Sequence, residues 1–83
     1  MAKASVLFKV YPKDPEQVDK TMDSIKSAMD PVGMQMQDVA FGIKVIKVLF
    51  VMEDASVGSS GLEERLKKVA GVGEVEVEEE SLL

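Results

Sequence analysis

Few residues in this chain are suited to chemistry, and they stand in short polar stretches. The sequence contains neither histidine nor cysteine, which removes the commonest general base, the thiol nucleophile and most transition-metal ligands. Among the carboxylates that remain, the pair Glu53-Asp54 could bind a hard cation. No loop, however, has the alternating oxygen ligands of a calcium site. We therefore interpret the pair as part of a solvated loop, and we expect no metal and no cofactor.

Two glycine-containing stretches call for comparison with nucleotide-binding motifs. Gly71-Val72-Gly73 precedes a predicted strand and lacks the third glycine of a dinucleotide fingerprint. Gly58-Ser59-Ser60-Gly61 leads into a predicted helix, but it lacks the Lys-Ser/Thr ending of a phosphate loop. A helix stop and a helix cap explain them adequately. The sequence therefore predicts a protein that is not an enzyme.

Length and charge exclude several kinds of partner. With 83 residues the chain has apolar material for one core, so we expect a single domain over residues 1–83. Fifteen acidic against ten basic side chains give a formal charge of -5, which repels nucleic acids. The apolar stretch from Val6 to Tyr11 is broken by Lys9 and is too short for a signal peptide or a membrane span. We expect a cytoplasmic protein, monomeric when free, that binds neither nucleic acid nor membrane.

Patterns of apolar residues predict the first three strands. Alternating apolar side chains indicate a first strand over 6–11, which Pro12 ends. A weaker alternation over 34–41 indicates an edge strand, with Gly42 at the following turn. The stretch 43–52 is nearly continuous in β-branched and aromatic residues, which is typical of a long strand in the middle of a sheet.

The first helix is predicted between the first two strands. Asp14 is placed to cap a helix that begins at Pro15, and Gln17 to complete a capping box. Apolar side chains recur at spacings of four, three and four, which forms one stripe for docking on a sheet. The stripe consists of Val18, Met22, Ile25 and Met29. Pro31 and Gly33 should close this element.

The last third of the chain predicts a second helix and a short strand. Ser60 and Glu63 form a capping box, and Gly71 is a natural stop. The buried stripe of this helix is expected to contain Leu62, Leu66 and Val69. Two valines then alternate with glutamates over 74–78 in a last strand, which leaves residues 79–83 as a flexible tail.

The order strand, helix, strand, strand, helix, strand predicts an α+β fold of the ferredoxin-like βαββαβ type. In this fold a four-stranded antiparallel sheet carries two helices on one face. One core is expected to contain Phe8, Ile25, Ile46, Val48, Phe50 and Leu66.

A resemblance to a known family rests on the centre of the chain. Phe41-Gly42-Ile43-Lys44, the strand that follows, and then Glu53-Asp54-Ala55-Ser56-Val57-Gly58 are similar to the exchange domain of elongation factor 1-beta. The helix start Leu62-Glu63-Glu64 also matches that family. The small size resembles its archaeal branch. Ser56 departs from the eukaryotic members, which carry a lysine there.

The resemblance implies a function and a partner. The family promotes release of GDP from the GTPase elongation factor 1-alpha during translation elongation, and this requires no covalent chemistry. The partner-binding residues that the resemblance implies are Phe41, Gly42, Lys44, Glu53, Asp54, Ala55, Ser56, Val57 and Gly58.

A ligand-sensing or oligomerising module of the same fold is the alternative. Such modules bury small molecules between paired sheets or helices, and their mark is an apolar open sheet face or edge. Leu7, Val45, Leu49 and Val51 could supply that face. Lys9 and Lys47 fall within it, which suits a polar protein interface at least as well.

Overall fold

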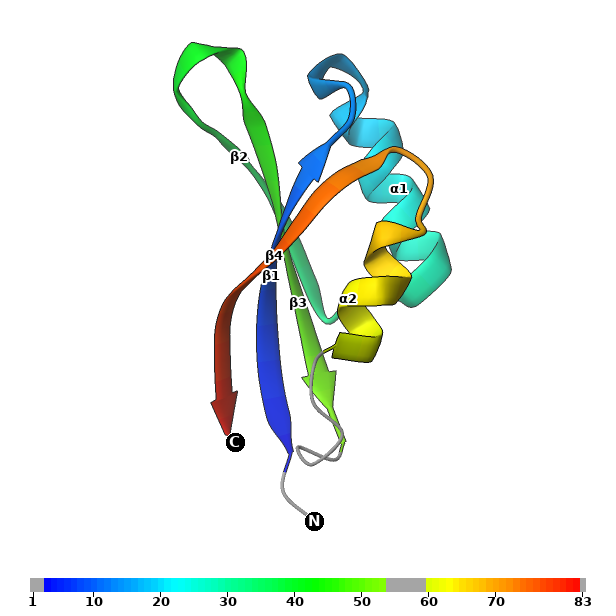
Figure 1. The fold of residues 1–83 in the computed structure, drawn as a ribbon, viewed down its shortest axis with the longest axis vertical. Coiled ribbons are helices and arrows are strands. Elements are labelled where there is room, and N and C mark those ends of the chain that lie inside the picture. The colour runs from blue at the N-terminus through cyan, green and yellow to red at the C-terminus, as the bar shows by residue number, and fades with distance from the viewer. Residues whose placement is uncertain (1–2, 54–59, 83) are drawn as a thin grey trace.

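A computed structural model describes residues 3–53 and 60–82 of the chain (Figure 1). Its strands are β1 (Ala4–Pro12), β2 (Gly33–Asp38), β3 (Lys44–Met52) and β4 (Val72–Leu82). Its helices are α1 (Val18–Met29) and α2 (Ser60–Lys67), and short 3-10 turns cover Pro15–Gln17 and Ala40–Gly42.

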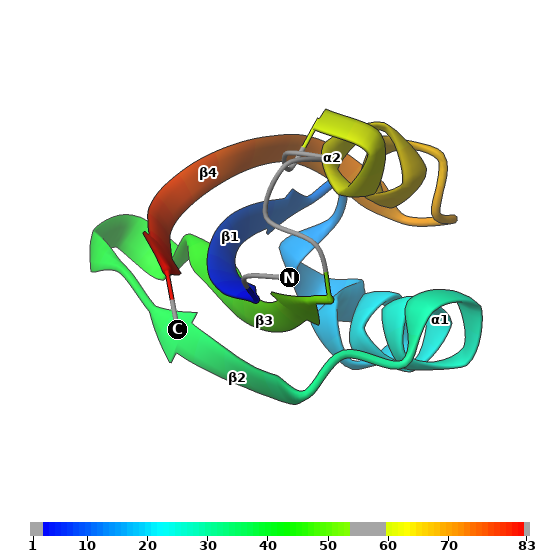
Figure 2. The same cartoon turned by 90° about the horizontal axis from the view of Figure 1, so that it is seen from below.

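The four strands form one antiparallel sheet in the order β2-β3-β1-β4. Both helices lie on the same face of this sheet, and the other face is open (Figures 1 and 2). The predicted ferredoxin-like α+β fold is therefore confirmed, with the long strand β3 in the interior of the sheet and β2 at one edge.

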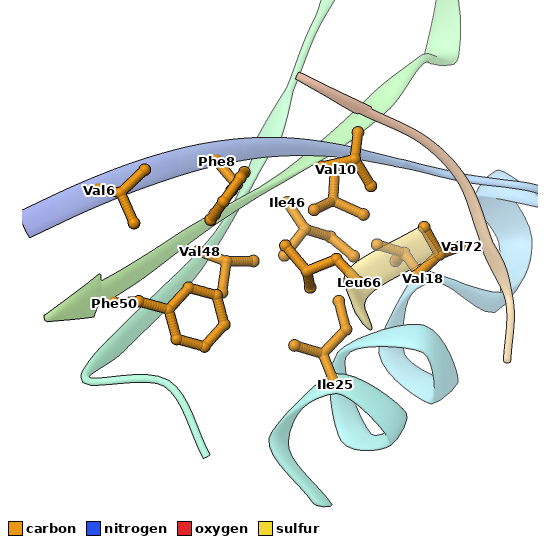
Figure 3. Packing of buried hydrophobic residues seen from close by; sticks show 11 residues of the cluster. Val6, Phe8, Val10, Val18, Ile25, Ile46, Val48, Phe50, Leu66 and Val72 are labelled. Atoms are coloured by element: carbon orange, nitrogen blue, oxygen red, sulfur yellow. The ribbon is translucent and has the colours of Figure 1, made fainter. Parts of the chain in front are cut away.

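Strand alternation places the core between sheet and helices. Val6 of β1 lies opposite Phe50 of β3, and Phe8 lies opposite Val48, so each pair faces the helices together. The Phe8 and Phe50 rings meet edge to face, with centroids 5.8 Å apart. Figure 3 shows Ile25 and Leu66 pointing from the two helices into this cluster. All six predicted core residues are buried in it: Phe8, Ile25, Ile46, Val48, Phe50 and Leu66.

The start of the first helix is tighter than expected. The Asp14 carboxylate accepts a hydrogen bond from the Glu16 N–H at 3.0 Å, and Pro15 follows directly, as predicted. The first turn is a 3-10 helix, however, and α1 begins only at Val18. Gln17 lies at the junction and makes no side-chain cap hydrogen bond. The expected capping box is therefore not formed.

Strand β2 is shorter than the sequence suggested. The alternation continues to Phe41, but pairing with β3 ends at the Asp38 and Lys44 positions. Phe41 lies in a turn with φ of 66°, and Gly42 follows with φ of 75°. The prediction of a strand through Phe41 was wrong, because two successive left-handed residues reverse the chain there. The turn at Gly42 is confirmed.

The second helix begins at Ser60 itself. The expected N-cap residue is thus the first helical residue, a difference of one position at the helix start. Leu66 is buried, while Leu62 and Val69 are half-buried against the core. The helix ends at Lys67, before the predicted stop at Gly71, which adopts φ of 88° in the turn that follows.

Strand β4 is longer than expected. It continues through Leu82, and residues 79–82 pair with the beginning of β1 where a flexible tail was expected. The backbone ladder satisfies its own hydrogen bonds without apolar side chains, so the charged run could not reveal the strand. The register shifts between Leu7 and Phe8, which indicates a bulge around Glu78.

Among the described residues, no helix is long and apolar enough to cross a membrane.

Candidate interaction site

The described members of the predicted site lie at the two ends of β3. Phe41 and Gly42 precede the strand and Glu53 follows it. A strand of nine residues spans about 30 Å, and the longest dimension of the molecule is 41 Å. The β2–β3 hairpin forms one pole of the molecule in Figure 1, and the far end of β3 lies toward the other. The structure therefore places the described members of the predicted site at opposite ends of β3 and not in one cluster.

The hairpin tip, defined as Val39 to Ile43, is closed by two backbone hydrogen bonds. The Val39 N–H donates to the Ile43 carbonyl at 2.7 Å, and the Ile43 N–H donates to the Ala40 carbonyl at 3.5 Å. Between them Phe41 is held in the left-handed region and is 99% exposed. A bulky residue rarely adopts this conformation. The tip therefore presents an aromatic ring to solvent at a conformational cost.

Two further apolar residues of the tip were not identified as site residues from the sequence. Val39 and Ile43 are each 46% exposed, so they extend the apolar surface on both sides of Phe41. The period-two pattern had placed Val39 and Phe41 together within a strand, and Ile43 at the start of the next one. Gly42 had marked the turn, but no signal in the sequence showed that the turn begins before Phe41. Lys44 is half-buried opposite Asp38 at the base.

The opposite end of β3 carries Glu53, an exposed carboxylate. Its Oε2 lies 3.5 Å from the Lys3 Nζ in an exposed ion pair. Glu53 also borders a groove of about 580 Å³ between the ends of α1 and α2. The described residues on its walls include Met29, Met52 and Leu62. Asp54, Ala55, Ser56, Val57 and Gly58 lie outside the described residues, so their predicted contacts stay predictions.

The open sheet face offers little free apolar surface. Of the residues expected there, Val45 is buried, Leu7 and Leu49 are half-buried, and Val51 is 36% exposed. Lys47 lies at its centre and forms an ion pair with Glu78 across β1. These features disfavour a module that binds apolar ligands on this face.

Within residues 3–53 and 60–82, no three His, Cys, Asp or Glu side chains are grouped so that they could hold a metal ion.

The sheet order β2-β3-β1-β4 and the two helices on one face define a ferredoxin-like α+β domain. The family model for the EF-1 guanine nucleotide exchange domain matches residues 5–83. The chain therefore belongs to this family, whose role is guanine nucleotide exchange on EF-1.

Several archaeal proteins named elongation factor 1-beta are similar to the chain over most of its length. The protein from Aeropyrum pernix is 40% identical, over 94% of this chain and 93% of that protein. The protein from Ignicoccus hospitalis is 39% identical, over 94% of this chain and 89% of that protein. The protein from Thermoplasma volcanium is 32% identical over the full length of both.

Proposed function

We propose that the chain promotes release of GDP from elongation factor 1-alpha and thereby supports translation elongation. Membership of the exchange-domain family and the names of the archaeal relatives support this proposal. Exchange requires that the factor bind the nucleotide-free GTPase more tightly than the nucleotide-bound form. By linkage, nucleotide must weaken the factor's hold on the GTPase to the same extent.

The observation that carries the proposal is Phe41. A fully exposed aromatic side chain in a left-handed conformation is unfavourable for the isolated domain. Partner interfaces are where exposed aromatic residues contribute most, because a pocket on the partner removes the ring from water. We assign the hairpin tip as one contact with the GTPase, with Phe41 as its anchor and Gly42 and Lys44 beside it.

The second contact is assigned to the other end of β3. Glu53 lies there, and the sequence places residues 54–58 directly after it. About 30 Å separates this end from the tip, so the two contacts fall on different parts of the GTPase. A factor that binds the GTPase at two distant points can favour one relative arrangement of the two contacted parts over another. A conformation of the GTPase with lower affinity for its nucleotide can be stabilised in this way.

The proposed function does not require this chain to catalyse a covalent reaction. The factor acts by differential binding, and the GTPase supplies the nucleotide site. Isothermal titration of GDP into the isolated protein should therefore give no measurable heat of binding. Micromolar binding of GDP to the protein alone would contradict the proposal.

Stopped-flow release of a fluorescent GDP from an archaeal elongation factor 1-alpha tests the proposal directly. Phe41→Ala should lower the rate of release at sub-saturating factor by more than about tenfold, as expected for a buried aromatic anchor. The control is Val77→Ala, which truncates an apolar side chain that is 41% exposed on β4, outside the hairpin tip. An unchanged rate for Phe41→Ala, with the wild-type chain active, would remove the tip from the interface. An inactive wild-type chain would reject the proposed function itself.

A further inference from the structure

The two edges of the sheet differ in charge. β4 carries Glu74, Glu76, Glu78, Glu79 and Glu80 and no Lys or Arg. The chain has 15 acidic and 10 basic residues, so these five glutamates account for the whole difference of five. Charged residues on an edge strand prevent pairing with another chain. The β4 edge is therefore protected against strand addition.

The β2 edge lacks this protection. Its six residues, Gly33–Asp38, contain a single charge, at the last position. The described residues place no strand beyond β2. Val32 and Val39 stand at its two ends and are 68% and 46% exposed. A neutral strand edge with apolar residues at both ends is suited to pair with another neutral strand.

The hydrogen-bond pattern shows which backbone groups are free to pair. Val39 donates to Ile43, and in the β2–β3 register Gln37 lies opposite Val45 and Gln35 opposite Lys47. Hydrogen-bonded pairs alternate along an antiparallel ladder, so odd-numbered residues of β2 bond to β3. The backbone groups of Met34 and Met36 are consequently directed away from β3, toward the open edge.

We infer that two copies of this chain associate through β2, with their strands antiparallel and the two-fold axis at Gln35. This register places Met34 of one copy opposite Met36 of the other, so their outward backbone groups form hydrogen bonds in pairs. It also keeps like faces together, because residues of the same parity meet. The two sheets become one sheet of eight strands, and the half-buried Met34 and Met36 side chains extend one apolar layer across the junction.

A second copy is favoured as the occupant because the edge is self-complementary. Under a two-fold axis, a residue i that faces residue j of the other copy is matched by a residue j that faces residue i. Only the residue at the axis faces the same residue of the other copy. That residue is Gln35, which is neutral and exposed. The charged Asp38 lies at the end of the strand, opposite Val32 of the partner copy, and so the two Asp38 carboxylates are kept apart. The Val32 N–H already donates to the Leu49 carbonyl at 2.9 Å, so the hydrogen-bonded pairing between the copies is confined to Met34 and Met36. The interface is small, so the association is expected to be weak. The chain is then a monomer at low concentration and a dimer at high concentration.

Analytical ultracentrifugation tests this surface. The mass should rise from 9.0 kDa toward twice that value as the concentration increases from about 10 µM to about 1 mM. Gln35→Lys and Gln35→Glu should each abolish the increase, because like charges would face each other across the axis. An equimolar mixture of the two variants should restore it, since opposite charges then meet. Ser81→Lys, on the β4 edge, should leave the wild-type behaviour unchanged.

The charge-swap mixture makes the result independent of folding damage in either variant. Circular dichroism should give wild-type spectra for both. A wild-type chain that stays monomeric up to about 1 mM would overturn the inference. Variants that dimerise like the wild type, or a mixture that remains monomeric, would do the same. None of these outcomes depends on the exchange activity.

Discussion

The hydroxyl of Thr21 in α1 lies 3.4 Å from the carbonyl oxygen of Gly71, fifty residues further along the chain, and 3.2 Å from the carbonyl oxygen of Gln17, one turn earlier, so its single proton is shared between the two acceptors. The Gly71 carbonyl also accepts the Lys13 N–H at 2.8 Å. Thr21 is the buried polar residue of the described core, 3% exposed. The turn after α2 is thus fixed to the β1–α1 connection, which links the two halves of the fold.

Gly71→Ala tests this link. Gly71 adopts φ of 88°, and a Cβ there would lie 2.6 Å from the Thr21 Oγ1. Both strain and overlap oppose a side chain, so the free energy of unfolding should fall by about 2 to 4 kcal/mol. Gly61→Ala is the matched control, because it lies in α2 with nothing within 4 Å of the added Cβ. It should raise stability by about 0.5 to 1 kcal/mol. Equal effects of the two variants in urea titration would show that the Gly71 contact is unimportant.

The sequence predicted correctly those elements in which apolar side chains recur at the period of the strand or helix that buries them. Continuous β-branched residues identified β3. The spacing of apolar residues within each helix identified the buried face of α1, which carries Val18 and Ile25, and that of α2, which carries Leu66. Both signals arise from burial, which the fold preserves. The C-terminus of α1 was predicted from Pro31 and Gly33, although Asp30 is the residue that takes the left-handed cap conformation.

The features that failed were those in which burial gives no signal. Residues 79–82 join the sheet through backbone pairing alone, so their charged side chains suggested a tail. Phe41 continued an apolar alternation but is fully exposed. Its residue type does not distinguish an aromatic side chain that binds a partner from one that is buried in the core. The predicted site is divided between the two ends of β3 because an extended strand separates them in space. A comparison of short sequence motifs does not show that separation.

Phe41→Gly should have opposite effects on stability and on exchange. Glycine adopts the left-handed conformation at position 41 without the cost that a side chain imposes, and the Phe41 ring is 99% exposed, so little burial is lost. The free energy of unfolding should rise by about 0.5 to 1 kcal/mol. Nucleotide exchange should fall, since the anchor is absent. Thermal unfolding and stopped-flow GDP release measure the two effects separately.

Phe41→Ala separates strain from contact in the same position. It removes the ring but keeps a Cβ in the left-handed region, so it should lower exchange without raising stability. If both variants left exchange unchanged, Phe41 would be a tolerated surface residue. If Phe41→Gly lowered stability, the turn would not be strained as its φ of 66° indicates.

The ion pair between Lys47 and Glu78 should be worth more than an ordinary surface pair. Both side chains are less than one-third exposed, at 24% and 32%. Lys47 also lies directly opposite Lys9 on the open face, so Glu78 offsets a like-charge contact. Glu78→Gln should lower the free energy of unfolding by about 1 kcal/mol, and Lys47→Gln by less, because the latter also removes the repulsion.

Lys3→Gln, in the exposed pair with Glu53, is the control and should have no measurable effect. Titrations at low and high salt would reveal the electrostatic origin, and equal losses for the two variants would argue against the Lys9 contribution.

The two proposed contacts with the GTPase should act additively. Phe41 precedes β3 and residues 55–57 follow it in the sequence; the ends of this strand are about 30 Å apart, and changes at such distances normally combine without coupling. Deleting residues 55–57 should strongly reduce GDP release, since the family resemblance assigns this stretch to the contact. Adding Phe41→Ala to the deletion should multiply the two losses in release rate at sub-saturating factor.

Circular dichroism should show that each variant folds, because loops tolerate change better than packed elements. A double variant no slower than the deletion alone would mean that the tip acts only through the loop contact. A deletion variant that exchanges GDP at the wild-type rate would leave the hairpin tip as the sole contact, and the two-point arrangement would have to be abandoned.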